Sequence, residues 1–386
     1  MPHGPDGNEQ YEYDKNNPRS RFASTGSEEE LGDMHLSTEN YSVALEYYEQ
    51  ALQRIYKTTP SDADLVRLYR KISDCYRKKG LLREATAFLR TASSHCGEED
   101  EIGRGTLLCR HGIILYDAGR NERALREALA AYRTLRTSNE HREVAHAQLL
   151  IANCYARKGK QNEAEQFFLD ALSSYRRIGD TVGESFVLNN LGLFHKNACR
   201  WGRALHFLNR ALEICNEVGL THHRVRVTLN LGIVHLKKRD FAAAESAFKE
   251  ARGMAKRTGD DIKYARSTLM LGVTETRTGN LTAAEKHLME ARVVAERRGY
   301  GREQLLADEF LGDLALERGD LEGARENYSV ACNGARKTNP ESDIVAEALR
   351  RLINVDFLEK KFAQAIESGS EALRVARACG ELHEIG

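Results

Sequence analysis

The sequence lacks several features that define whole classes of protein. Among its 386 residues only 5 are proline and 7% are aromatic, and it contains no run of 18 or more apolar residues. No membrane-spanning helix is therefore expected, and the scarcity of proline suits a mostly helical chain. The 57 basic residues are balanced by 57 acidic ones, so no basic excess indicates nucleic acid or a membrane surface as a partner.

Motifs for chemistry are missing as well. The eight cysteines are spread over the chain without a C-x-x-C pair, which is typical of buried thiols in a reducing compartment rather than of disulfides or zinc ligands. The first residues have no apolar segment of the kind that directs secretion, so a cytoplasmic location is expected. Neither G-x-x-x-x-G-K-[ST] nor H-E-x-x-H occurs. The sequence therefore predicts no enzymatic activity, no metal site and no cofactor.

What the sequence does contain is an internal repeat of about 40 residues. Nine positions, which we call the anchors, follow one another at steps of 39 to 41 residues. Eight of the nine hold a small residue: Gly32, Ser73, Gly112, Ala152, Gly192, Gly232, Gly272, Gly312 and, as the exception, Ile353. Alanine stands 12 and 19 residues after every anchor, as Ala204 and Ala211 do after Gly192. Nine such units indicate a solenoid in which each repeat packs only on its neighbours.

Each unit reads as two helices joined by a turn. Helical periodicity continues past the anchor, a glycine follows seven residues later in five units, and the second helix carries both alanines. Small residues at these three places allow two helices to approach closely. The second helix should end in a left-handed residue 27 positions after the anchor, including Asn139, Asn339 and Gly380. Ser27 with Glu30 predicts a capping box at the first helix.

The small anchor, the turn glycine and the paired alanines resemble the tetratricopeptide repeat family. The Gly-Asp pairs at 179–180 and 259–260 and the Asn-Leu-Gly at 190–192 and 230–232 are similar to its 40-residue variety, found in cell-polarity adaptors, kinesin light chains and bacterial signalling regulators. The resemblance covers residues 25–380 as nine units. It implies an all-α, right-handed superhelix whose first helices line a concave surface that binds ligands.

The two ends lie outside this array. Residues 1–24 are predicted to be a disordered acidic tail. Residues 381–386 look like the start of a truncated tenth unit. Because solenoids normally end in a capping element, an uncapped last repeat would favour self-association or a further segment of a longer protein.

The resemblance assigns six positions of each first helix to the concave groove. In units four to seven, six of these 24 positions are basic and none is acidic. Asparagine carboxamides can pair with peptide amides, and arginines can hold carboxylates, so this groove is predicted to bind an acidic peptide or protein segment. Its candidate residues are Asn153, Arg157, Asn189, Asn190, Lys196, Arg226, Asn230, Lys237, Arg266 and Arg277. A secondary basic patch is predicted at Arg67, Arg70 and Lys71, and an acidic end at Glu309, Asp313 and Glu317.

Other interpretations stay open. The groove charges could simply solvate a wide concave surface. The protein is interpreted as a regulatory or sensory module of a larger, transcription-regulating protein. One alternative is a small signalling-peptide sensor like the pheromone-responsive regulators, and a second is an RNA-binding helical array, although no base-reading residue pair recurs. His195 and His235 are interpreted as packing residues, and His222 and His223 as a solvated loop.

Overall fold

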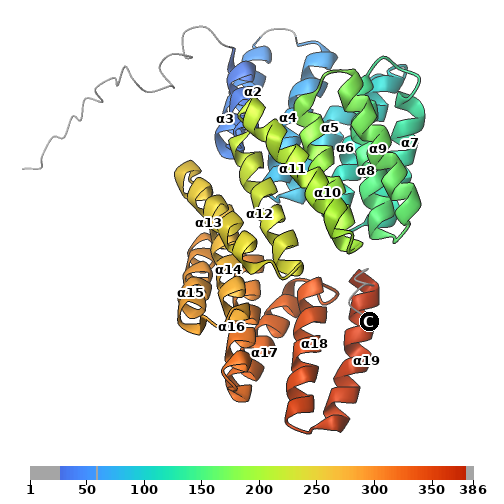
Figure 1. Cartoon of the computed structure of the whole chain (residues 1–386). Helices are drawn as coiled ribbons and strands as arrows, with labels where there is room; N and C mark the ends of the chain where they lie inside the picture. The colour runs from blue at the N-terminus through green and yellow to red at the C-terminus, as the bar shows by residue number, and fades with distance from the viewer. Residues whose placement is uncertain (1–26, 58–59, 380–386) are drawn as a thin grey trace, which may run out of the picture. The chain divides into compact units, whose positions relative to one another are not determined.

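The protein is described by a computed structural model that covers residues 27–57 and 60–379 (Figure 1). These residues form eighteen helices and no strand. The first helices of the repeats are α2 (Glu28–Ser37), α4 (Asp62–Lys78), α6 (Glu101–Asp117), α8 (His141–Arg157), α10 (Thr181–Asn197), α12 (Thr221–Lys237), α14 (Asp261–Arg277), α16 (Gly301–Glu317) and α18 (Asp343–Leu358). The second helices are α3 (Tyr41–Ile55), α5 (Leu82–Ser94), α7 (Asn121–Leu135), α9 (Gln161–Arg177), α11 (Trp201–Val218), α13 (Phe241–Thr258), α15 (Leu281–Arg298), α17 (Leu321–Thr338) and α19 (Phe362–Cys379).

The predicted all-α architecture of nine two-helix repeats is thus confirmed for the described residues. The capping box before α2 is also present, since Ser27 and Glu30 exchange side-chain and backbone hydrogen bonds. The predicted acidic tail at 1–24 and the truncated unit at 381–386 lie outside the described residues. Among the described helices, none combines the length and apolar character needed to cross a membrane.

Two compact units divide the chain, and the boundary falls between Arg120 and Asn121, inside the third repeat. The sequence period gives no sign of this division. In the second unit, each first helix packs on its own second helix and on the one before it. Some helices that are two apart in the chain also contact each other. Between α8 and α18, the most extensive of these contacts are all between first helices. The first helices therefore lie on the inner face of the second unit, as the family resemblance implied.

Close approach at the anchor is confirmed, and its partner is a large side chain 16 residues later. A Cβ built on Gly192 would lie 2.5 Å from Cγ of Leu208, and one on Gly232 would lie 2.5 Å from Cε1 of Phe248. Sixteen of the eighteen repeat alanines are buried. The exceptions, Ala365 and Ala372, are partly exposed in α19, the last of the described helices.

The turn between the two helices has the same backbone conformation in all nine repeats. The residue seven positions after the anchor has a positive φ in every case, including the five predicted glycines. Four repeats hold a side chain there: Glu39, Cys199, Arg239 and Lys360, with φ between 54° and 63°. A left-handed conformation costs a non-glycine residue about 1–2 kcal/mol, so these four turns are strained.

Glycine at one of these turns is expected to stabilise the protein. Arg239 is exposed with φ of 63°, so Arg239→Gly should raise the free energy of unfolding by about 0.5–1 kcal/mol after the entropy lost by glycine is subtracted. Lys238→Gly is the matched control, because Lys238 has a right-handed φ of −75° and should only lose stability. Denaturant unfolding followed by circular dichroism measures both, and a loss in both variants would contradict the strain.

The ends of the second helices follow the prediction only in part. Four glycines at the predicted position are left-handed: Gly179, Gly219, Gly259 and Gly299. Asn339 was wrongly predicted, because its φ is −152° and the following Pro340 forces an extended conformation. Asn139 is also not left-handed, since α7 already ends at Leu135. Gly380 lies outside the described residues.

A ring stack recurs at the first-to-second helix contact and includes one of the histidines. His195, three residues after its anchor, stacks on Phe207 with ring centroids 5.3 Å apart, as Tyr76 stacks on Phe88 at 5.1 Å. Burial lowers the pKa of His195, whose side chain is fully buried. The interpretation of His195 as a packing residue is therefore confirmed.

Candidate peptide-binding groove

All ten predicted groove residues lie on four consecutive first helices of the second unit. Asn153 and Arg157 belong to α8, and Asn189, Asn190 and Lys196 belong to α10; Arg226, Asn230 and Lys237 belong to α12, and Arg266 and Arg277 belong to α14. The secondary patch, Arg67, Arg70 and Lys71, lies on α4 in the first unit. The two predicted basic areas therefore belong to different units.

Three of the asparagines form a carboxamide chain across α10 and α12. Nδ2 of Asn230 donates to Oδ1 of Asn189 at 2.8 Å, and Nδ2 of Asn189 donates to Oδ1 of Asn190 at 3.4 Å. Asn189 is 4% exposed and Asn230 is 9% exposed, so their orientations are fixed by packing. Asn190 is partly exposed. Because each carboxamide has two donor hydrogens and an oxygen with two lone pairs, the chain keeps hydrogen-bonding capacity for a ligand backbone at Asn190.

An aromatic contact positions Arg226 beside this chain. Its guanidinium lies 5.8 Å from the ring centroid of Phe186, which in turn contacts the His223 ring at 4.1 Å. His223 is buried in the first turn of α12. The interpretation of His222 and His223 as a solvated loop is therefore wrong, because α12 begins immediately after the junction residue Leu220.

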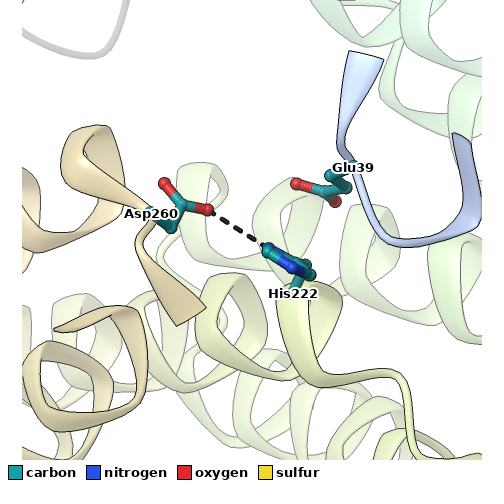
Figure 2. Close-up of side chains that lie close together, drawn as sticks. All are labelled: Glu39, His222 and Asp260. Atoms are coloured by element: carbon teal, nitrogen blue, oxygen red, sulfur yellow. Dashed lines mark ion pairs between the residues drawn. The ribbon is translucent and has the colours of Figure 1, made fainter. Parts of the chain in front are cut away.

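The neighbouring His222 links α12 to the start of α14. Its Nδ1 lies 3.5 Å from Oδ2 of Asp260, and Figure 2 shows the two side chains facing each other. Asp260 caps α14 by accepting a hydrogen bond from the backbone N–H of Lys263 at 3.0 Å. Burial would raise the pKa of Asp260, but hydrogen bonds from His222 and Lys263 outweigh it and hold this pKa well below its usual range. The charged Asp260 thus fixes adjacent first helices in the groove wall.

Part of the basic character of the groove has a structural origin. Arg157, Lys237 and Arg277 are the last residues of α8, α12 and α14, where the helix dipole favours a positive charge. Arg157 also donates from Nη1 to Oδ1 of Asn121 at 3.1 Å. These three cations stabilise their helices whether or not a ligand is bound.

Acidic residues of α16 reach two of the predicted cations, Arg266 and Arg277. Nε of Arg266 donates to Oε1 of Glu303 at 2.7 Å, and Arg277 lies 3.9 Å from both Asp313 and Glu317. These pairs join different first helices, so they cannot be seen in the residues of one helix taken alone. Their signal in the sequence is an arginine and an acid about one repeat apart.

Two residues of the secondary patch, Arg67 and Lys71, pair with acids in the first unit, in what we call the first acid–tyrosine cluster. Nζ of Lys71 lies 2.7 Å from both Glu29 and Asp33, and the hydroxyl of Tyr48 donates to Asp33 at 2.7 Å. Nε and Nη2 of Arg67 donate to the two carboxylate oxygens of Glu29 at 2.8 and 3.1 Å. Arg67 and Lys71 therefore do not form an open basic patch. The acids that pair with them belong to α2, and the prediction considered only the groove positions of α4.

The predicted acidic end contains the same arrangement at the same repeat positions, the second acid–tyrosine cluster. Nη1 of Arg351 lies 2.8 Å from Oε1 of Glu309, and Nε of Arg351 donates to Oδ1 of Asp313 at 2.8 Å. The hydroxyl of Tyr328 donates to Asp313 at 2.8 Å. Glu347 adds a third carboxylate, 2.5 Å from Nη1 of Arg351.

Comparison with known families agrees with this repeat architecture. Models described as tetratricopeptide repeat match residues 29–63, 109–179, 184–257 and 229–299. Together these ranges cover more than half of the chain. The chain belongs to the tetratricopeptide repeat family. No curated protein sequence matches it.

Solved structures with the same fold include three bacterial regulators. A Rap protein complexed with competence and sporulation factor is 12% identical with a TM-score of 0.69, over 92% of this chain and 98% of that one. The Rap conjugation gene regulator of plasmid pLS20 in complex with the Phr* peptide is 14% identical with a TM-score of 0.57, over 90% and 97%. The apo quorum sensor NprR from B. thuringiensis is 16% identical with a TM-score of 0.58, over 80% and 86%. At these identities the likeness shows a shared fold.

Proposed function

We infer that this protein is a non-enzymatic binding module whose second unit holds an acidic peptide or protein segment along α8, α10, α12 and α14. The observation that carries this inference is the carboxamide chain, in which the buried Asn189 and Asn230 orient the partly exposed Asn190 on the inner face. An extended ligand would pair its backbone amides with these carboxamides.

Acidic side chains of the ligand would be held by the cations beside this chain. Arg226 and Lys196 lie on α12 and α10, and Lys237 is exposed at the end of α12. Arg266 and Arg277, on α14, also pair with acids of α16. The carboxamide chain crosses α10 and α12, so we place the ligand backbone and its carboxylates beside these two helices.

A small signalling peptide is a second candidate ligand for the same groove. Two of the structures with this fold are complexes with the competence and sporulation factor and with the Phr* peptide, and each is matched over nearly its whole length. This supports a sensory role in a cytoplasmic regulator of signalling or transcription.

Self-association is proposed through α19, where the apolar side chains of Phe362 and Ile366 are exposed, that of Ile366 by 74%.

A peptide array tests the proposal. Random 12-residue peptides, with oligoribonucleotides as a separate set, are screened for binding, and the best peptide is measured by fluorescence anisotropy. Acidic peptides should be enriched, and Arg226→Glu and Asn230→Ala should each weaken binding about tenfold or more, equal to about 1.4 kcal/mol. Preferred binding of RNA, or of basic peptides, would overturn the assignment.

The control variant carries the same charge change on α15, which is the second helix of its repeat. Arg297→Glu alters an exposed residue near the end of α15 and should leave peptide affinity within about twofold, equal to about 0.4 kcal/mol. Thermal melts of all variants confirm that the repeats remain folded. Equal losses in Arg226→Glu and Arg297→Glu would show that net charge, and not the groove, determines binding.

A further inference from the structure

The two acid–tyrosine clusters are built on the same repeat positions but differ in the charge of one residue. Glu29 and Glu309 stand three residues before their anchors. The residue six positions before the following anchor is Arg67 in the first cluster and Glu347 in the second. A second cation in one cluster is therefore replaced by a third carboxylate in the other.

This difference leaves Glu309 with less compensation than Glu29. Arg67 and Lys71 both reach Glu29. Among the described residues only Arg351 forms an ion pair with Glu309, and it is shared with Asp313 and Glu347. Arg302 also acts on Glu309 through its charge, but it is paired with Asp343. Glu309 is 2% exposed, and its Oε2 has no hydrogen-bond partner in the described part of the chain. A buried carboxylate oxygen without a donor is costly.

The protonation of the two glutamates reflects the same difference. Burial acts against the charge of Glu29, but hydrogen bonds from Arg67 and Lys71 lower its pKa below the usual value. Burial raises the pKa of Glu309 to about 7. The positive charge of Arg351 lowers this pKa, but the negative charges of Asp313, Glu347 and Asp343 act against Arg351. Tyr328 of α17 also faces this group, and Arg277 of α14 lies near Asp313.

The second cluster lies on the same face of the first helices as the carboxamide chain. Glu309 occupies the repeat position of Asn189, and Glu347 occupies that of Arg226. From the α10–α12 pair to the α16–α18 pair there are three steps between contacting first helices. At roughly 10 Å a step the two sites are about 30 Å apart, which an extended peptide spans with about nine residues.

We propose that Glu309, Asp313 and Glu347 form a subsite for a guanidinium or ammonium group of the groove ligand, in the role that Arg67 has in the first cluster. This rests on the proposed function. The ligand is then bipolar: acidic side chains bind near α10 and α12, and a basic side chain or the terminal amine, about nine residues away, binds between α16 and α18.

Two labelled 12-residue peptides test the subsite. Each carries three glutamates near one end, and nine residues away one has arginine and the other has citrulline, its neutral isostere; both chain directions are made. The arginine peptide should bind the full chain about tenfold more tightly than the citrulline peptide. Glu309→Gln should reduce this preference to less than about twofold, while Glu322→Gln, an exposed acid on α17, should retain it.

The preference should also depend on pH. With a pKa of about 7, Glu309 is roughly one-tenth ionised at pH 6 and nine-tenths at pH 8. Since the cation binds the ionised form, the arginine preference should grow several-fold over this range in the wild type but not in Glu309→Gln. A preference independent of pH and of Glu309 would overturn the proposal.

The outcomes separate the subsite from the groove. If both peptides bind equally and both depend on Asn230, the groove is supported and the subsite is overturned. If neither peptide binds, the proposed function fails, and N-acetylargininamide decides the subsite alone by calorimetry. Binding that is lost in Glu309→Gln then supports the subsite, and no binding at millimolar concentration overturns it.

Discussion

Replacement of Gly232 by valine is expected to lower the free energy of unfolding by about 3 kcal/mol. A Cβ at this position would lie 2.5 Å from Cε1, 2.7 Å from Cδ1 and 3.0 Å from Cζ of Phe248. Phe248 is fully buried and packs with Ala244 and Leu271, so its ring cannot move away without displacing the second helix. The midpoint of urea unfolding, followed by circular dichroism, measures the loss.

Two further variants separate the close contact from helix propensity. Gly253 lies in α13 with only the end of the Arg257 side chain nearby, so Gly253→Ala should stabilise the helix by about 0.5–1 kcal/mol. Gly232→Ala should cost about 1 kcal/mol, since the fourth repeat accommodates Ala152 beside a buried Phe168. Gain of stability in Gly232→Val would show that the anchor does not require a small residue.

Arg351→Met is expected to be still more destabilising, by about 3–5 kcal/mol at pH 8. Arg351 is mostly buried and is the cation that Glu309, Asp313 and Glu347 share. Its removal leaves three carboxylates close together, and two of them, Glu309 and Asp313, are mostly buried. The neighbouring Arg350→Met is the control: this side chain is exposed and pairs only with Glu347 among the described residues, so its loss should cost less than about 1 kcal/mol.

The effect of Arg351→Met should decrease as the pH falls. The pKa of Glu309 is about 7, above the usual 4.5, because of burial, and loss of Arg351 raises it further. As the pH falls, folded Glu309 therefore takes up its proton earlier in the variant than in the wild type, where it does so near pH 7. The variant regains stability relative to the wild type over the interval between the two pKa values, just above pH 7. Unfolding at pH 6 should show a smaller loss than at pH 8, and Glu309→Gln should restore part of the loss at pH 8. An equal loss at both pH values would contradict this account.

Most of the fold could be predicted from residues that repeat. The spacing of Gly192, Ala204 and Ala211 places two helices in close contact, because small side chains at these positions are needed for helix packing in every repeat. The failures occurred where a repeat departs from the pattern. Asn339 precedes a proline, and the helix before Asn139 ends early. The boundary after Arg120 also had no periodic signal.

The candidate site was predicted less well. Asn189 and Asn230 could be predicted as groove residues from their positions in single helices, but the hydrogen bond between their carboxamides could not. In the sequence, Arg266 and Glu309 belong to separate basic and acidic areas. Their partners, Glu303 and Arg351, belong to the next first helix, and their register depends on how far each repeat is displaced along its neighbour.

Local spacing repeated nine times was enough to predict the number of repeats, the two helices of each repeat and the small residues where these helices meet. Which groove charges neutralise each other, and which remain under-compensated, follows only from the folded arrangement. Charge compensation depends on distances between side chains of different repeats and on their burial. A neutral chain of 57 basic and 57 acidic residues thus combines a carboxamide-lined site on α10 and α12 with a carboxylate cluster on α16 and α18.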